Sequence, residues 1–71
     1  MKLLINGKDA ETAEKLTVSE LLAERKVKWP DMVSVELNGA IVERDSFPTT
    51  ALSEPDRLEF LYFMGGGRGA N

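Results

Sequence analysis

The chain has 71 residues, a net charge of −3 at pH 7, and neither cysteine nor histidine. This length suits one small domain. A thiol nucleophile, the usual general base and the usual metal ligands are therefore missing, so we expect neither an enzyme nor a metal site. The acidic balance argues against a nucleic-acid-binding protein. With no leader segment and no apolar run of membrane-spanning length, the sequence predicts a cytoplasmic protein.

The predicted elements begin with a β-hairpin near the N-terminus. Residues 2–5 form a short apolar run, and residues 8–13 are expected to form the strand that returns beside it. Between them lies Asn6-Gly7, a pair typical of two-residue hairpin turns because both residues tolerate positive φ angles.

The second predicted element is a helix from Val18 to about Lys26. Thr17 and Glu20 have the spacing of a capping box, in which each side chain satisfies a backbone N–H at the helix start. Arg25 and Lys26 are expected in the last turn, where the helix dipole favours positive charge.

A second hairpin and a final strand complete the predicted fold. Apolar residues alternate with polar ones over residues 33–37, which predicts a half-buried strand. Asn38-Gly39 then predicts a turn into a returning strand at residues 40–42. Residues 43–55 are rich in turn-forming residues and are expected to be irregular, and residues 57–64 are expected to form the last strand.

This order of elements predicts an α+β fold of the β-grasp type, in which one main helix packs across one face of a mixed sheet of about five strands. The first and last strands are expected to be parallel neighbours in the centre of the sheet. We expect residues 1–64 to form the domain and residues 65–71 to form a flexible, glycine-rich tail.

Strand alternation places Leu61 and Phe63 on the face opposite Leu58. An exposed apolar pair beside the tail would suit docking to a partner protein. The other interpretation is that both faces of the strand are partly covered by the rest of the domain.

The tail begins with three consecutive glycines, Gly65, Gly66 and Gly67. Glycine has no side chain, and three extended residues span about 10 Å. Such a thread could carry a carboxylate into a narrow site on another protein. The alternative interpretation is an ordinary frayed terminus.

Five segments in a fixed order carry a family resemblance, namely Ile5–Gly7, Thr17–Leu22, Val35–Val42, Asp56–Glu59 and Phe63–Gly67. In this pattern the chain resembles the ThiS/MoaD family of sulfur carrier proteins, which share the ubiquitin-like β-grasp fold. The resemblance covers residues 1–67 and is closest to the members that serve thiamin biosynthesis.

The resemblance implies that the Gly67 carboxyl is adenylated by a ThiF-like activating enzyme, which uses MgATP, and is converted to a thiocarboxylate. Gly65 and Gly66 would form the thread, and thiazole synthase would accept the sulfur. The carrier itself would bind no cofactor. The alternatives are a MoaD-like carrier for molybdopterin or another sulfur-transfer pathway, and a β-grasp interaction module without chemistry.

The chain departs from the family pattern at residues 68–71, which follow Gly67. The Gly67 carbonyl is therefore part of a peptide bond and cannot be adenylated. Some related carriers are trimmed by a metalloprotease, and we expect such a cut after Gly67. The competing interpretations are an added tail and a carrier that is no longer competent.

Overall fold

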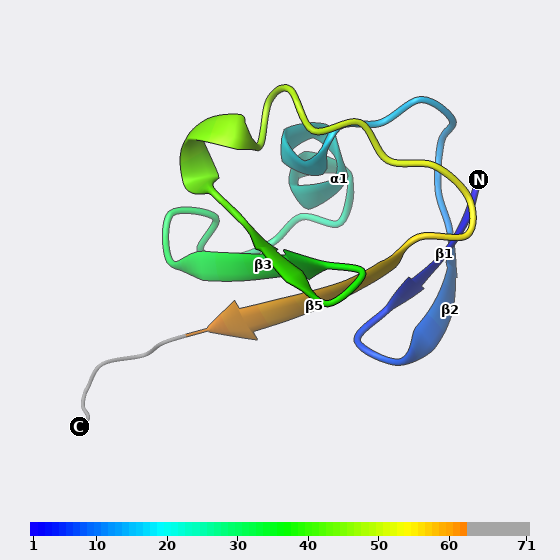
Figure 1. Cartoon of the computed structure of the whole chain (residues 1–71), viewed down its shortest axis with the longest axis horizontal. Helices are drawn as coiled ribbons and strands as arrows, with labels where there is room; N and C mark the ends of the chain where they lie inside the picture. The colour runs from blue at the N-terminus through cyan, green and yellow to red at the C-terminus, as the bar shows by residue number, and fades with distance from the viewer. Residues whose placement is uncertain (63–71) are drawn as a thin grey trace.

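The computed structural model describes residues 1–62 of the chain. Figure 1 shows its elements, which are β1 (Lys2–Ile5), β2 (Lys8–Glu11), α1 (Val18–Glu24), β3 (Val33–Leu37), β4 (Ala40–Val42), the 3₁₀ helix η1 (Arg44–Ser46) and β5 (Arg57–Tyr62). The end of the predicted last strand, residues 63 and 64, and the predicted tail, residues 65–71, lie outside the described residues.

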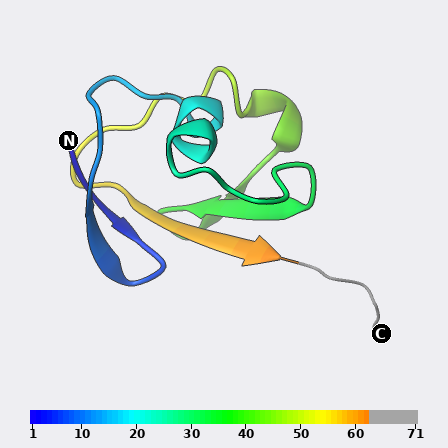
Figure 2. The same cartoon turned by 180° about the vertical axis from the view of Figure 1, so that it is seen from behind.

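The strands form one mixed sheet in the order β2-β1-β5-β3-β4. β1 and β5 are parallel neighbours, and the other neighbouring pairs are antiparallel. The helix α1 lies over one face of this sheet, as Figures 1 and 2 show from opposite sides. The predicted β-grasp fold, with the first and last strands side by side, is confirmed.

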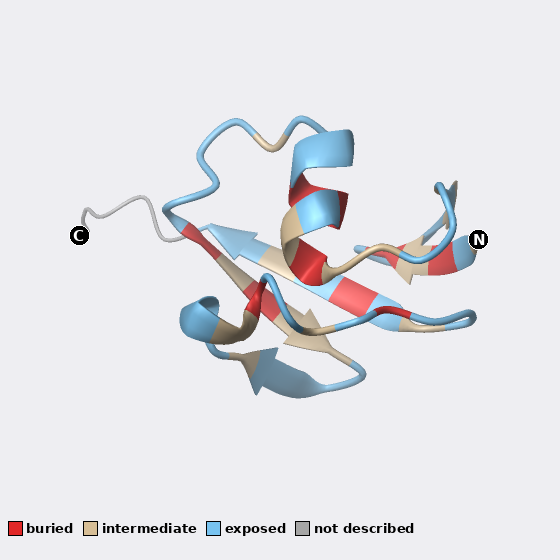
Figure 3. Ribbon diagram, turned by 90° about the horizontal axis from the view of Figure 1, so that it is seen from above, coloured by how far each residue is buried: buried red, intermediate tan, exposed pale blue. Residues whose placement is uncertain are grey.

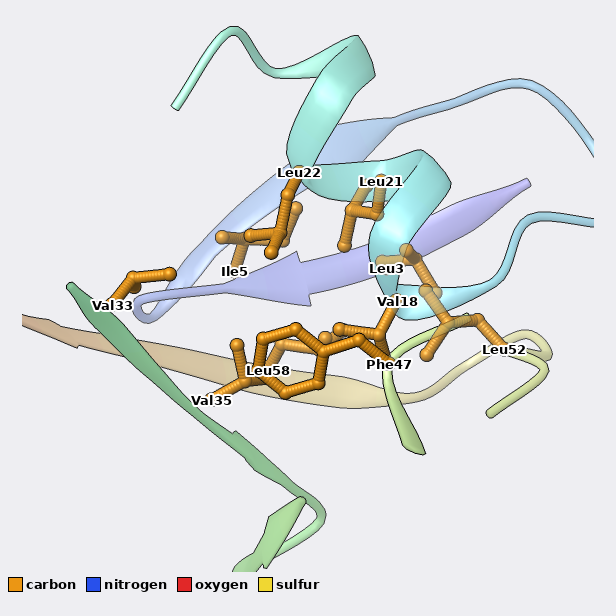
Figure 4. Packing of buried hydrophobic residues seen from close by; sticks show 10 residues of the cluster. All are labelled: Leu3, Ile5, Val18, Leu21, Leu22, Val33, Val35, Phe47, Leu52 and Leu58. Carbon is orange, nitrogen blue, oxygen red and sulfur yellow. The ribbon is translucent and has the colours of Figure 1, made fainter. Parts of the chain in front are cut away.

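The hydrophobic core lies between α1 and the sheet. Figure 3 shows that the buried positions of α1 alternate with exposed ones, and Figure 4 shows the buried side chains meeting between helix and strands. The core residues, each at most 8% exposed, are Leu3, Ile5, Val18, Leu21, Leu22, Val33, Val35, Phe47, Leu52 and Leu58. Within residues 1–62 no polar or charged residue is buried, so the core depends on apolar packing alone.

The predicted capping box at the start of α1 is confirmed. The backbone N–H of Glu20 donates to Oγ1 of Thr17 at 3.2 Å, and the backbone N–H of Thr17 donates to Oε1 of Glu20 at 2.9 Å. These two bonds satisfy donors that the helix cannot pair internally, and so they fix where the helix begins.

The helix ends earlier than predicted, at Glu24 instead of about Lys26. The backbone N–H groups of Lys26 and Val27 turn back to the carbonyls of Ala23 and Leu22, each at 3.1 Å, which is the Schellman pattern of a helix C-terminus. Lys26 has a left-handed φ of 54°. The basic residues therefore follow the helix and do not lie in its last turn.

The strand β2 is also shorter than predicted, because it ends at Glu11 and not at residue 13. Its partner β1 begins at Lys2, which is paired with Glu11. Next to this pair, the Met1 ammonium donates to the carbonyl of Thr12 at 2.6 Å, and the Met1 carbonyl accepts from the N–H of Thr12 at 2.9 Å and from its Oγ1 at 3.3 Å. The strand stops where its neighbour stops, because β2 is at the edge of the sheet and has no other partner.

Candidate functional site

The residues predicted to carry chemistry, Gly65, Gly66 and Gly67, lie outside the described residues, and so does Phe63. What the structure describes is the strand that directly precedes them, β5, which ends at Tyr62. Because β5 lies between β1 and β3, the predicted tail is joined to the centre of the sheet and not to an edge.

β5 is held on its two sides to different extents. β3 pairs with it from Leu58 to Tyr62, whereas β1 pairs only with Arg57 and Leu58. The side chain of Leu58 is 1% exposed and fixes the strand in the core. The base of the predicted tail is therefore built on a strand with a buried anchor and one complete neighbour.

Both Asn-Gly turns also hydrogen-bond to this part of the chain through their asparagine side chains. Oδ1 of Asn6 accepts from the backbone N–H of Phe60 at 2.8 Å, and Oδ1 of Asn38 accepts from that of Arg57 at 2.9 Å. The amide Nδ2 of Asn38 donates to Oδ1 of Asp56 at 3.0 Å. The sequence predicts the turns but not this second role, for which its only signal is the asparagine in both turns.

The face of the sheet that points away from α1 carries the predicted docking residue Leu61. Its side chain is 36% exposed, and the residue is paired with Ser34 of β3. Ile41 of β4 is 57% exposed and belongs to the same outer face, because its partner Glu36 lies opposite Glu59. Leu61 is thus exposed, and its role in docking stays a prediction.

The described part of the chain shows neither a metal-binding cluster nor a membrane-spanning helix. Among residues 1–62, no three potential ligands lie close enough together to hold a metal ion. In the same range no helix is both long and apolar enough to cross a bilayer; α1 has seven residues. The feature that remains is a five-stranded sheet whose central strand precedes the glycine run.

The model of the ThiS family matches residues 3–67. The chain belongs to the ThiS family. Two structures of the thiamine biosynthesis protein (ThiS) from Geobacter metallireducens are similar to it, each with 49% identity. The crystal structure has a TM-score of 0.86 and covers 94% of this chain and all of that one. The solution NMR structure has a TM-score of 0.77 and covers 94% of this chain and 88% of that one.

Two thiazole synthases also match this ThiS-family chain. The protein from Paramagnetospirillum magneticum is 40% identical over 67 residues, and that from Magnetococcus marinus is 37% identical over 68 residues. The matches cover 94% and 96% of this chain. The chain spans only about a fifth of the length of each relative, 20% and 21%.

These comparisons confirm the predicted family and fold. The chain is of the ThiS type and is similar in sequence and structure to a thiamine biosynthesis protein.

Proposed function

We propose that the C-terminal carboxyl of Gly67, once free, carries sulfur for thiazole formation in thiamin biosynthesis. A ThiF-like enzyme adenylates it: a Gly67 carboxylate oxygen attacks the α-phosphorus of MgATP, and pyrophosphate leaves. A hydrosulfide equivalent then attacks the carbonyl carbon and expels AMP, which leaves a thiocarboxylate. The carrier is the substrate in these steps and supplies no catalytic group.

The observation that supports Gly67 as the reacting residue is the extent of the family match, which ends at residue 67. The residue types fit the chemistry. Without Cβ atoms, Gly66 and Gly67 can enter a channel narrow enough to keep water from the adenylate, which water would hydrolyse.

This function requires a free Gly67 carboxyl, and residues 68–71 follow it in the sequence. We propose that a metalloprotease hydrolyses the bond between Gly67 and Arg68. One water is consumed, and the products are the Gly67 carboxylate and the peptide Arg68-Gly69-Ala70-Asn71.

Thiazole synthase is the proposed sulfur acceptor. Support comes from the two relatives that bear this name, because each contains a region similar to this chain within one longer polypeptide. A carrier region joined to the acceptor is kept at a high effective concentration near it. This chain and thiazole synthase would meet either as separate proteins or as separate regions of one polypeptide.

In the test, the chain ending at Gly67 is mixed with MgATP, a ThiF-like enzyme and sulfide. The mass of the chain is then measured by mass spectrometry. We expect a gain equal to the exchange of one oxygen for sulfur. The chain continued to Asn71 is the matched control and should not change until a metalloprotease has cut it. No gain with cognate enzymes would refute the proposal.

A second experiment separates the carrier from a simple interaction module. Deletion of residues 65–71 removes the thread but none of the described fold. In cells that depend on this protein for thiamin, the deletion should abolish growth without added thiamin. Undiminished growth would favour the interaction module.

A further inference from the structure

A groove lies between the segment that follows α1, the β1–β2 hairpin and the last residues of β5. Its volume is about 430 Å³. The three bordering segments can be followed in Figure 2. The residues that matter for its chemistry are Lys8, Arg25, Lys26, Lys28, Phe60 and Tyr62. It is on the helix side of the sheet, away from the outer face that carries Leu61.

The groove gathers positive charge on an acidic protein. The chain has nine lysines and arginines, of which Arg68 lies outside the described residues, and four of the other eight line this groove. Asp9 is the one carboxylate among its lining residues. All four basic residues are exposed, and the ammonium of Lys28 lies 5.1 Å from the ring centre of Trp29. A positive surface of this kind attracts an acidic partner.

The groove also contains an open strand edge. β1 pairs with β5 only as far as Leu58, and the next N–H on that side, from Phe60, bonds to the Asn6 side chain. Because backbone groups alternate in direction along a strand, the carbonyl of Phe60 and the N–H of Tyr62 point to the same side. Within residues 1–62, no strand lies beside them there. An edge of this kind can pair with an added strand.

We propose that this groove binds an extended acidic segment of the protein that receives the carrier's end. The segment adds as a short strand beside Phe60 and Tyr62, and its carboxylates lie over Lys8, Arg25 and Lys28. A peptide backbone, unlike a free anion, supplies both the donor and the acceptor that the open edge requires. The identity of the partner rests on the proposed function, because residues 63–67 directly follow this edge. The binding of an acidic peptide to the groove does not depend on that function.

The probe is a capped synthetic peptide that alternates glutamate with threonine, titrated into the ¹⁵N-labelled chain. We expect shifts in the backbone amides of Lys8, residues 25–28 and residues 60–62, and slower hydrogen exchange at the Tyr62 amide. Binding should weaken as salt is raised. The matching lysine–threonine peptide should leave the spectrum unchanged.

The charge-reversal variant Lys8→Glu/Lys28→Glu should weaken peptide binding by about tenfold or more. The control Lys2→Glu/Lys15→Glu reverses the same number of charges on exposed residues outside this groove, and it should bind as the unchanged chain does. The ¹⁵N spectrum of each variant shows that it is folded.

Three results would overturn the proposal: no binding, shifts centred on the outer face around Leu61, or equal weakening by both double variants. Inorganic phosphate that produced the same shifts and the same Tyr62 protection would also overturn it, because the site would then recognise an anion alone. The sulfur-loading assay is measured separately. If no sulfur were loaded while the peptide still bound, the carrier chemistry would be refuted, and the assignment of the groove as a peptide-binding site would stand.

Discussion

The side-chain oxygen Oδ1 of Asn6 accepts a hydrogen bond from the backbone N–H of Phe60 at 2.8 Å, across 54 residues of sequence. β1 ends at Ile5, so this side chain takes the place of the next backbone acceptor in the parallel ladder. The first turn of the chain thereby holds the strand that leads to the glycine run.

Asn6→Ala should lower the free energy of unfolding by about 2 kcal/mol. It removes this bond, and alanine lacks the polar side chain that lets asparagine tolerate the left-handed φ of 51°. Urea unfolding followed by circular dichroism measures the change. Asn6→Asp keeps an acceptor and tolerates the left-handed conformation, so it should lose clearly less. An alanine variant as stable as the unchanged chain would contradict the role of the bond.

Asn38 and Asp56 should be energetically coupled, because Nδ2 of Asn38 donates to Oδ1 of Asp56 at 3.0 Å. In a double-mutant cycle of the two alanine variants, we expect a coupling of about 0.5–1.5 kcal/mol. Asn6→Ala combined with Asp56→Ala is the control, because Asn6 belongs to the other turn, and its effects should add. Equal coupling energies in both pairs would show that the coupling comes from a general weakening of the sheet and not from the Asn38–Asp56 hydrogen bond.

Lys26→Gly should stabilise the fold by roughly 0.5–1 kcal/mol, because Lys26 holds a left-handed φ of 54° that glycine adopts without strain. Ala23→Gly places the same residue inside α1 and should instead destabilise by about 0.5–1 kcal/mol. Thermal unfolding measures both. Destabilisation by the two variants alike would mean that Lys26 contributes packing that outweighs its backbone strain.

Leu61→Ser tests the predicted partner docking, with the proposed activating enzyme as the partner. If the exposed side chain of Leu61 is buried in that complex, its loss should raise the apparent KM for adenylation by about tenfold, measured as pyrophosphate release. Ile41→Ser removes a more exposed apolar side chain from the same outer face, on β4 at the edge of the sheet. This control should change the KM little. A larger increase in KM for Ile41→Ser than for Leu61→Ser would indicate that the docking surface is centred on β4.

Much of the fold is predictable because its signals are local. Thr17 and Glu20 bond to each other across three residues, so their spacing in the sequence was enough to locate the helix start. Residues 33–37 are paired on both sides and buried on one face, which produces the alternation that predicted β3.

The helix end was mispredicted for an equally physical reason. Glycine usually marks a left-handed residue after a helix, but here Lys26 occupies that position. Nothing in the residue type shows that the turn occurs there. The bonds from Lys26 and Val27 back into the helix decide it, and these bonds are visible only in the structure.

The candidate site was predictable only where one stretch of sequence contains it. The glycine run is contiguous, and the family match extends to its last residue. The basic groove joins three stretches, around Lys8, residues 25–28 and residues 60–62, so no pattern in the sequence indicates it. The Asn6–Phe60 bond likewise joins residues that are 54 positions apart in the sequence, so no local pattern indicates it.

The position of β5 in the sheet also determines how the molecule would respond to mechanical load. A partner that pulls on the chain beyond Tyr62 along the strand would strain the ladders with β1 and β3 in shear, so their hydrogen bonds would resist together. An edge strand pulled in the same direction would be held by one ladder instead of two. Such a domain can have its end drawn into a tight passage and withdrawn again without unravelling.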